Sequence, residues 1–121
     1  MEIPKIHEGE YRFCLILWEH GPIAAAQLAR LCQEQLGWKR TTTYTVIKKC
    51  IEKGAIERRE PNFICHAQIT KQQAQKEEAE TLVEKVFGGS AELLFASILS
   101  DRSLSKDELA RLKALVEAME E

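Results

Sequence analysis

The stretch WKRTTTYTVIKKCIEKGAI, residues 38–56, decides the fold of this chain. The pattern predicts one helix between Gly37, in a tight turn, and Gly54, a residue type that commonly takes the left-handed conformation past a helix end. Side chains about 100° apart along this helix form an apolar face of Thr43, Val46, Ile47 and Cys50, with Ile51 at its edge. We expect this face to pack in the core.

The opposite face of the same helix is polar and positively charged. Thr41, Thr45 and Lys48 lie at its centre, and no carboxylate occurs before Glu52. Short hydroxyl side chains let a helix lie deep in the major groove, while Lys and Arg at its margins bind phosphates. The pattern predicts a recognition helix over about residues 40–53. Its expected DNA-binding residues are Lys39, Arg40, Thr41, Thr42, Tyr44, Thr45, Lys48 and Lys49.

For one such helix taken alone, an ordinary solvent-exposed cationic face is the alternative interpretation. The distribution of charge favours DNA. The net charge of the whole chain is only −2, but residues 39–70 hold seven basic and three acidic groups, whereas residues 1–38 and 71–121 are both net acidic. Positive charge is therefore concentrated around the predicted recognition helix, as a phosphate-binding surface requires.

Two further helices are expected before the recognition helix. Residues 8–20 are apolar on nearly every side, and Gly21-Pro22 ends that segment. A second helix is expected from about Ala24 to Leu36, followed by a short turn after Gly37. The second helix, the turn and the basic helix together predict a helix-turn-helix unit.

After Gly54 the pattern changes to two short extended runs, residues 55–59 and 63–69, joined by Glu60-Pro61-Asn62. This predicts a β-hairpin, which in a winged helix lies beside the recognition helix and contacts the DNA backbone. The predicted wing therefore covers about residues 55–69, with DNA-binding residues Arg58, Arg59 and Asn62.

The last part of the chain predicts three helices, over about residues 71–87, 91–100 and 106–119. Thr70 with Gln73 and Ser105 with Glu108 have the spacing of capping boxes. Some 51 residues in three helices cannot easily bury their own apolar side chains, so a second copy is expected to cover them. The expected dimerisation residues are Leu82, Val86, Phe87, Leu94, Ile98, Leu109, Leu112, Val116 and Met119.

The fold class predicted is therefore mainly α with a small β-hairpin, with a winged helix-turn-helix over residues 1–70 and a helical dimerisation domain over 71–121. Packing of the last helices on the winged helix is the alternative to dimerisation. No stretch approaches the roughly 20 apolar residues of a membrane span and no basic-then-apolar leader opens the chain, so a cytoplasmic protein without a membrane partner is expected.

The four cysteines, at positions 14, 32, 50 and 65, form no CxxC pair, and no metal site or cofactor is expected. Free cysteine commonly packs as a small hydrophobe, so buried, inert thiols are predicted. A thiol sensor at Cys65, beside His66, is an alternative, although adjacent strand residues point to opposite faces. The histidines lie in unrelated elements and no nucleophile motif or phosphate loop occurs, so we do not expect an enzyme.

The order of elements and several motifs resemble the penicillinase-repressor (BlaI/MecI) family over almost the whole chain. The motifs are Ile6…Leu17-Trp18-Glu19, Pro22, Trp38, Thr42, Thr45, Lys49, Lys53-Gly54-Ala55, Phe87-Gly88-Gly89-Ser90 and Leu104-Ser105…Glu108-Leu109. The resemblance implies a homodimeric transcriptional repressor that binds a palindromic operator in double-stranded DNA. It assigns recognition to Thr42 and Thr45. The other helix residues are expected to bind DNA because they lie on the polar, positively charged face of the same helix.

The resemblance also implies ways of releasing DNA. In β-lactam-responsive members, a membrane-sensor pathway leads to a cut at an Asn-Phe bond in the C-terminal helices, and the aligned position here is Ser97-Ile98. A regulatory protease is thus an implied partner, with poor cleavage expected at this bond. Copper-responsive relatives end in Cys-x-Cys, whereas this sequence ends Ala118-Met119-Glu120-Glu121, so copper sensing by that device is not expected.

The wing departs from its relatives, with Asn62-Phe63 where Gly-Arg is common and with Cys65 and Ala67 in place of aromatic residues. The resemblance therefore supports DNA contacts by the wing less strongly than DNA contacts by the predicted recognition helix. The alternative function from another class is a winged-helix module that binds only protein. A basic helix face that binds duplex DNA in a salt-dependent way would distinguish the two, because an interaction module has no need of one.

Overall fold

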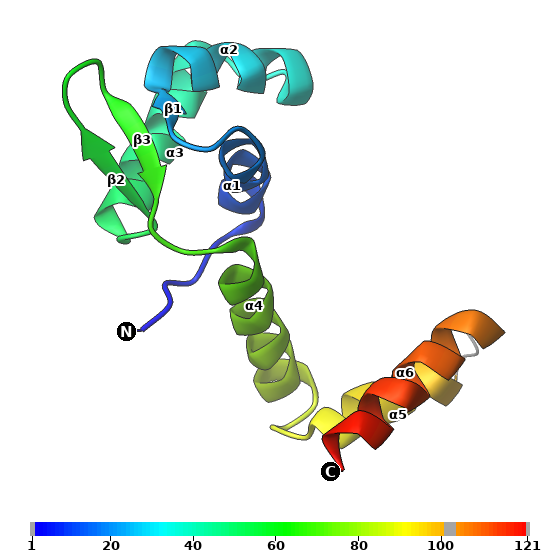
Figure 1. The fold of residues 1–121 in the computed structure, drawn as a ribbon. Helices are drawn as coiled ribbons and strands as arrows, with labels where there is room; N and C mark the ends of the chain where they lie inside the picture. Colours follow the sequence, from blue (N-terminus) through cyan, green and yellow to red (C-terminus); the bar gives the residue numbers. More distant parts are fainter. Residues whose placement is uncertain (1, 101–103, 121) are drawn as a thin grey trace. The chain divides into compact units, whose positions relative to one another are not determined.

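The computed structural model describes residues 2–100 and 104–120 (Figure 1). The chain is mainly helical with a small antiparallel sheet, which confirms the predicted fold class. By internal contacts it divides into two compact units, residues 1–79 and 80–121. The elements are α1 (Glu8–His20), β1 (Ile23–Ala24), α2 (Ala25–Leu36), α3 (Arg40–Glu52), β2 (Ile56–Arg59), β3 (Ile64–Ala67), α4 (Lys71–Val86), α5 (Ala91–Ser100) and α6 (Lys106–Met119).

The first unit is built around the helix-turn-helix of α2 and α3. Gly37 has φ 71° and ψ 19°, the left-handed conformation expected after a helix, and its N–H donates to carbonyls of the last turn of α2. The helix α3 begins three residues later, at Arg40. No side chain caps α2, in agreement with the Ala at position 24.

One hydrophobic core joins α1, α2, α3 and the sheet. The helix α1 is enclosed on several sides, as its all-round apolar sequence predicts, and α3 contributes the side of the helix opposite its basic face. The largest fully buried side chains are Phe13, Leu17, Leu28, Ile47, Thr43, Cys14, Cys32, Cys50 and Cys65.

The sheet has three strands in the order β1-β3-β2, all antiparallel. The predicted hairpin, β2 and β3, is present, but the strand β1 was not predicted, because two residues are too short to show an alternating pattern. Ile23 of β1 lies opposite Cys65 of β3. The hairpin strands are also shorter than predicted, since Asn62 and Phe63 both have positive φ and belong to the turn.

The start of α4 is tied to the first unit. Trp18 on α1 donates through Nε1 to the carbonyl of Ile69, at 3.0 Å. The predicted capping box is present, because Gln73 N donates to Thr70 Oγ1 at 3.0 Å and Thr70 N donates to Gln73 Oε1 at 2.9 Å. These bonds fix where the winged helix ends and α4 begins.

The second unit holds the end of α4 with α5 and α6. The second predicted capping box is also present, with Glu108 N donating to Ser105 Oγ at 3.1 Å. Among the described residues from 80 to 120, none is buried. None of the described helices could span a membrane. The functional division predicted at residue 70 stays a prediction, since α4 contributes to both units.

Candidate nucleic-acid interface

The helix α3 has the two faces that its sequence predicts. Thr43, Ile47 and Cys50 are fully buried, with Val46 and Ile51 half-buried beside them. The polar face is open to solvent and consists of Lys39, Arg40, Thr41, Thr42, Thr45, Lys48 and Lys49, all exposed. Tyr44 is half-buried at the edge of this face. The structure thus brings the eight predicted helix residues onto one side of α3 and its N-terminal end.

The hydroxyl of Thr45 is already engaged within the helix. Its Oγ1 donates to the carbonyl of Thr41 at 2.9 Å. This bond uses the hydroxyl proton and fixes the rotamer, so the oxygen lone pairs and the methyl group remain for a partner. In a major groove, such a side chain can accept from a base amino group or contact a thymine methyl group.

The wing carries both of the predicted arginines, and each is paired with a glutamate of the wing. Arg58 Nε donates to Glu60 Oε1, and Arg59 Nε donates to Glu57 Oε1. These hydrogen bonds lower the pKa of both carboxyls from their ordinary value. Exposed ion pairs of this kind contribute little to stability.

The tip of the wing is a tight turn. Asn62, the third predicted wing residue, is exposed there with φ 71°, a conformation that Asn tolerates better than most residues. The next residue, Phe63, is half-buried and contacts Tyr44 of α3, with the ring centroids 6.1 Å apart in an edge-to-face arrangement. The aromatic pair therefore links the wing directly to α3.

An ion pair fixes the C-terminal end of α3. It was not predicted from the sequence. Lys53 Nζ donates to Glu10 Oε1 at 2.5 Å and to the carbonyl of Lys5 at 3.0 Å. Burial alone would raise the pKa of the Glu10 carboxyl, but the bonds from Lys53 and from His7 N outweigh it and hold the pKa below its usual value. Spacing gives no signal for this pair, because its members are 43 residues apart.

All four cysteines are buried and free, as predicted. Cys65 is fully buried, and burial raises the pKa of its thiol to about 11. Such a thiol is almost entirely protonated at neutral pH, which argues against the thiol-sensor alternative. Among the described residues, no group of three or more His, Cys, Asp or Glu side chains is placed to hold a metal ion.

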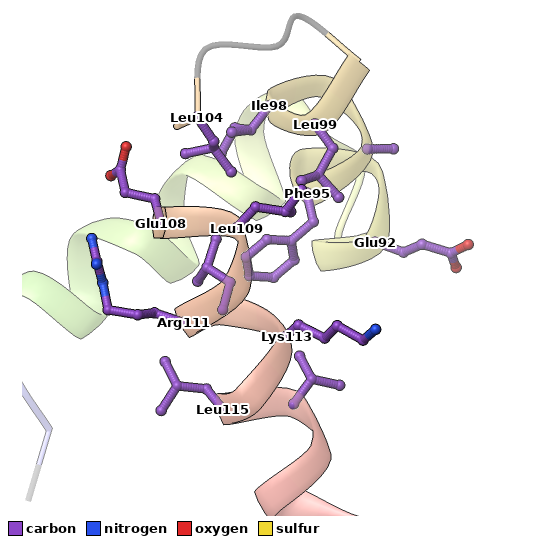
Figure 2. Close-up of a pocket in the computed structure, with 13 residues that line it drawn as sticks. Glu92, Phe95, Ile98, Leu99, Leu104, Glu108, Leu109, Arg111, Lys113 and Leu115 are labelled. Carbon is purple, nitrogen blue, oxygen red and sulfur yellow. The ribbon is translucent and has the colours of Figure 1, made fainter. Parts of the chain in front are cut away.

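The second unit presents a separate apolar surface. A groove between α5 and α6 is lined by Phe95, Leu99, Leu109 and Val116, with Glu92, Glu108, Arg111 and Lys113 among its charged residues (Figure 2). Of the predicted dimerisation residues, Leu82, Val86, Leu109, Val116 and Met119 are exposed, while Phe87, Leu94, Ile98 and Leu112 are half-buried. The structure adds exposed apolar residues outside that set, namely Leu93, Phe95, Leu99 and Leu115.

The sequence profile of a family described as penicillinase repressor matches residues 6–118. The chain belongs to the penicillinase repressor family. It is therefore a DNA-binding regulator of transcription at the level of the family, and its relatives are regulatory proteins rather than enzymes.

The chain is also similar to individual proteins. The methicillin resistance regulatory protein MecI of Staphylococcus aureus (strain Mu50) is 24% identical over 114 residues, 93% of each chain. The MecI protein of Mammaliicoccus sciuri is 23% identical over the same share. An uncharacterized 16.5 kDa protein of Latilactobacillus sakei is 23% identical, covering 94% of this chain and 80% of its own. Among solved structures, RV1404 from Mycobacterium tuberculosis matches 96% of this chain and 75% of its own, at 23% identity and a TM-score of 0.48.

Proposed function

We propose that this penicillinase repressor family member is a homodimer that binds a palindromic operator, each protomer placing α3 in the major groove. The observation that carries the proposal is the exposed face of α3, which has hydroxyls at its centre and cations at its margins, with no carboxylate before Glu52. Hydroxyls that read base edges and cations that bind phosphates are the two kinds of contact a recognition helix makes.

The second unit supports the homodimer. Described residues 80–120 include none that is buried, and Val86, Leu115 and Met119 are among those that expose large apolar side chains. Large apolar side chains exposed together on so small a unit mark an interaction site. Because the charged residues around the α5–α6 groove include both acidic and basic side chains, a second copy related by a two-fold axis can place opposite charges together.

Relief of repression is a separate part of the proposal. A regulatory protease that selects an Asn-Phe bond meets Ser97-Ile98 in this chain, within the helix α5. Even one missing methylene group in a selective hydrophobic pocket reduces kcat/KM by about 10- to 200-fold. We therefore propose that release from DNA uses another cut or a signal that acts on the dimer without proteolysis.

The test is selection of duplexes from a random-sequence DNA pool by the purified full-length chain. We expect enrichment of an inverted repeat whose half-sites are centred about one helical turn apart, roughly 34–36 Å, or a multiple of it. Enrichment of a single asymmetric half-site would contradict the two-fold arrangement. No enrichment together with no salt-dependent binding would overturn DNA binding and favour a protein-interaction module.

A further inference from the structure

The two adjacent arginines of the wing lie on opposite faces of the hairpin. In the β2–β3 register Arg58 lies opposite Cys65, whereas Arg59 lies opposite Ile64. Side chains alternate along a strand and cross-strand partners share a face. Arg58 therefore shares its face with the buried residues Ile56 and Cys65, on the side of the sheet that packs in the core. Arg59 lies on the outer face.

Arg58 is held by two contacts that use different parts of its guanidinium group. The group lies over the ring of Phe63, 3.7 Å from the ring centroid, and Nε donates to Glu60 Oε1. The other oxygen of Glu60 accepts from Phe63 N at 3.2 Å, so the three residues form a closed ring of contacts. Within residues 2–100 and 104–120, no hydrogen bond from the two Nη groups of Arg58 is observed. The Nη groups are therefore available to bind a phosphate.

The same ring of Phe63 is connected to the recognition helix. The ring of Phe63 makes an edge-to-face contact with the ring of Tyr44. Tyr44 in turn contacts Arg40, whose guanidinium lies 5.2 Å from the centroid of the Tyr44 ring and donates to the Tyr44 hydroxyl at 3.3 Å. These contacts thus form a row with an arginine at each end, Arg58 and Arg40, and two half-buried aromatic rings between them, Phe63 and Tyr44. Rigid rings hold the two cations at a set separation with little loss of side-chain entropy on binding.

We propose that Arg58 is the phosphate contact of the wing, and that Tyr44 and Phe63 are positioning residues that hold it in register with Arg40 on α3. Arg59, paired with Glu57 on the outer face, makes no such contact. The inference rests on the proposed function, because it concerns the same DNA-binding surface. The wing then has one arginine that binds DNA, Arg58, and one that does not, Arg59.

The experiment measures affinity for a labelled duplex of scrambled sequence, about three helical turns long, across a salt series. Phosphate contacts do not depend on sequence, so the operator is not needed. We expect Arg58→Ala to weaken binding by about ten-fold or more for each protomer bound and to reduce the salt slope by about 0.9 per lost contact. The matched control, Arg59→Ala, should change affinity by less than about two-fold, with an unchanged slope.

The positioning role is tested by a double-mutant cycle. Phe63→Leu keeps an apolar side chain but removes the ring under the guanidinium, and should weaken binding by about two- to five-fold. Phe63→Tyr keeps the ring and should bind as the wild type does. In the Arg58→Ala background, Phe63→Leu should have no further effect, since the group that it positions is gone. Thermal unfolding of each variant checks that the fold is retained.

Equal losses for Arg58→Ala and Arg59→Ala would overturn the division of the wing. A full Phe63→Leu effect in the Arg58→Ala background would overturn the positioning role. If Arg58→Ala does not fold, Arg58→Lys takes its place in the cycle, because it removes the planar stack and keeps the charge. A wild-type chain that does not bind duplex would instead refute the proposed function, whereas a wild type that binds alongside an unaffected Arg58→Ala refutes this inference alone.

Discussion

The ion pair between Lys53 and Glu10 gives the Lys-Gly-Ala sequence after α3 a physical role. Glu10 is 5% exposed, and its carboxylate needs a cation and hydrogen bonds to remain charged there. Lys53 supplies the cation and His7 N supplies one bond, while a second bond from Lys53 reaches the carbonyl of Lys5. The end of α3 is thereby fixed to the start of α1.

Replacing Lys53 with Met should destabilise the fold by about 2–3 kcal/mol at pH 7, because it leaves the Glu10 carboxylate buried without its cation. Chemical denaturation measures the change. The exposed Lys48→Met, in the same helix, is the control and should stay within about 0.5 kcal/mol of wild type. A loss of the same size in both variants would mean that the ion pair has no special role.

The same pair predicts a dependence on pH. The pKa of Glu10 is held below 4.5 in the folded chain, so its stabilising contribution is present above the unfolded value and is lost as pH falls through the folded one. In Lys53→Met the unpaired carboxyl takes up a proton more readily. The stability difference between wild type and variant should therefore narrow as the pH falls below about 4.5.

At the scale of elements, much of the fold could be predicted because apolar periodicity and caps are local signals. The helix α1 has the predicted bounds, and the capping boxes at Thr70 and Ser105 are both present. The strand β1 was missed because its identity depends on pairing with β3, whose partner residues are 40 and 42 positions further along the chain, and not on its own pattern. The two faces of α3 were predictable, since each is set by spacing within one helix.

The contacts that organise the wing could not be predicted in the same way. The aromatic pair of Tyr44 and Phe63, and the placement of Arg58 and Arg59 on opposite faces, depend on the register of the hairpin. The sequence predicts a hairpin over residues 55–69 but does not fix its register, and a shift by one residue would exchange the faces. Only the structure separates the two arginines.

The helix α3 carries a prediction of its own. Thr42→Ala or Thr45→Ala should reduce the preference for the selected operator over scrambled duplex by about 1 kcal/mol or more, because we propose that these side chains contact base edges. Lys48→Ala or Lys49→Ala should weaken binding to both duplexes alike and reduce the salt slope by about one unit per contact.

Competitive binding to the two duplexes over a salt series measures both effects. The control is Lys76→Ala, an exposed lysine of α4 that lies outside the proposed surface and should leave both quantities unchanged. The assignment of α3 fails if all four helix variants keep the affinity and preference of the wild type.

At the scale of the whole molecule, the apolar surface of the second unit is the feature that most needs a partner. The sequence predicts apolar stripes on the last helices, but whether such stripes meet each other or another chain depends on how the helices pack. Described residues 80–120, of which none is buried, leave the large side chains of Phe95, Leu115 and Val116 exposed. We propose a second copy as the partner, which would link two reading helices and raise operator affinity.

Sedimentation equilibrium of the full-length chain with the selected operator duplex tests directly whether the chain binds DNA as a dimer. We predict a complex of two chains and one duplex for the wild type. Val116→Asp should lose the dimer and bind far more weakly, since two linked half-site contacts become independent, whereas the exposed control Glu117→Gln should match the wild type. Operator binding by a dimer would be contradicted if the wild type formed a complex of one chain and one duplex and bound no more tightly than Val116→Asp.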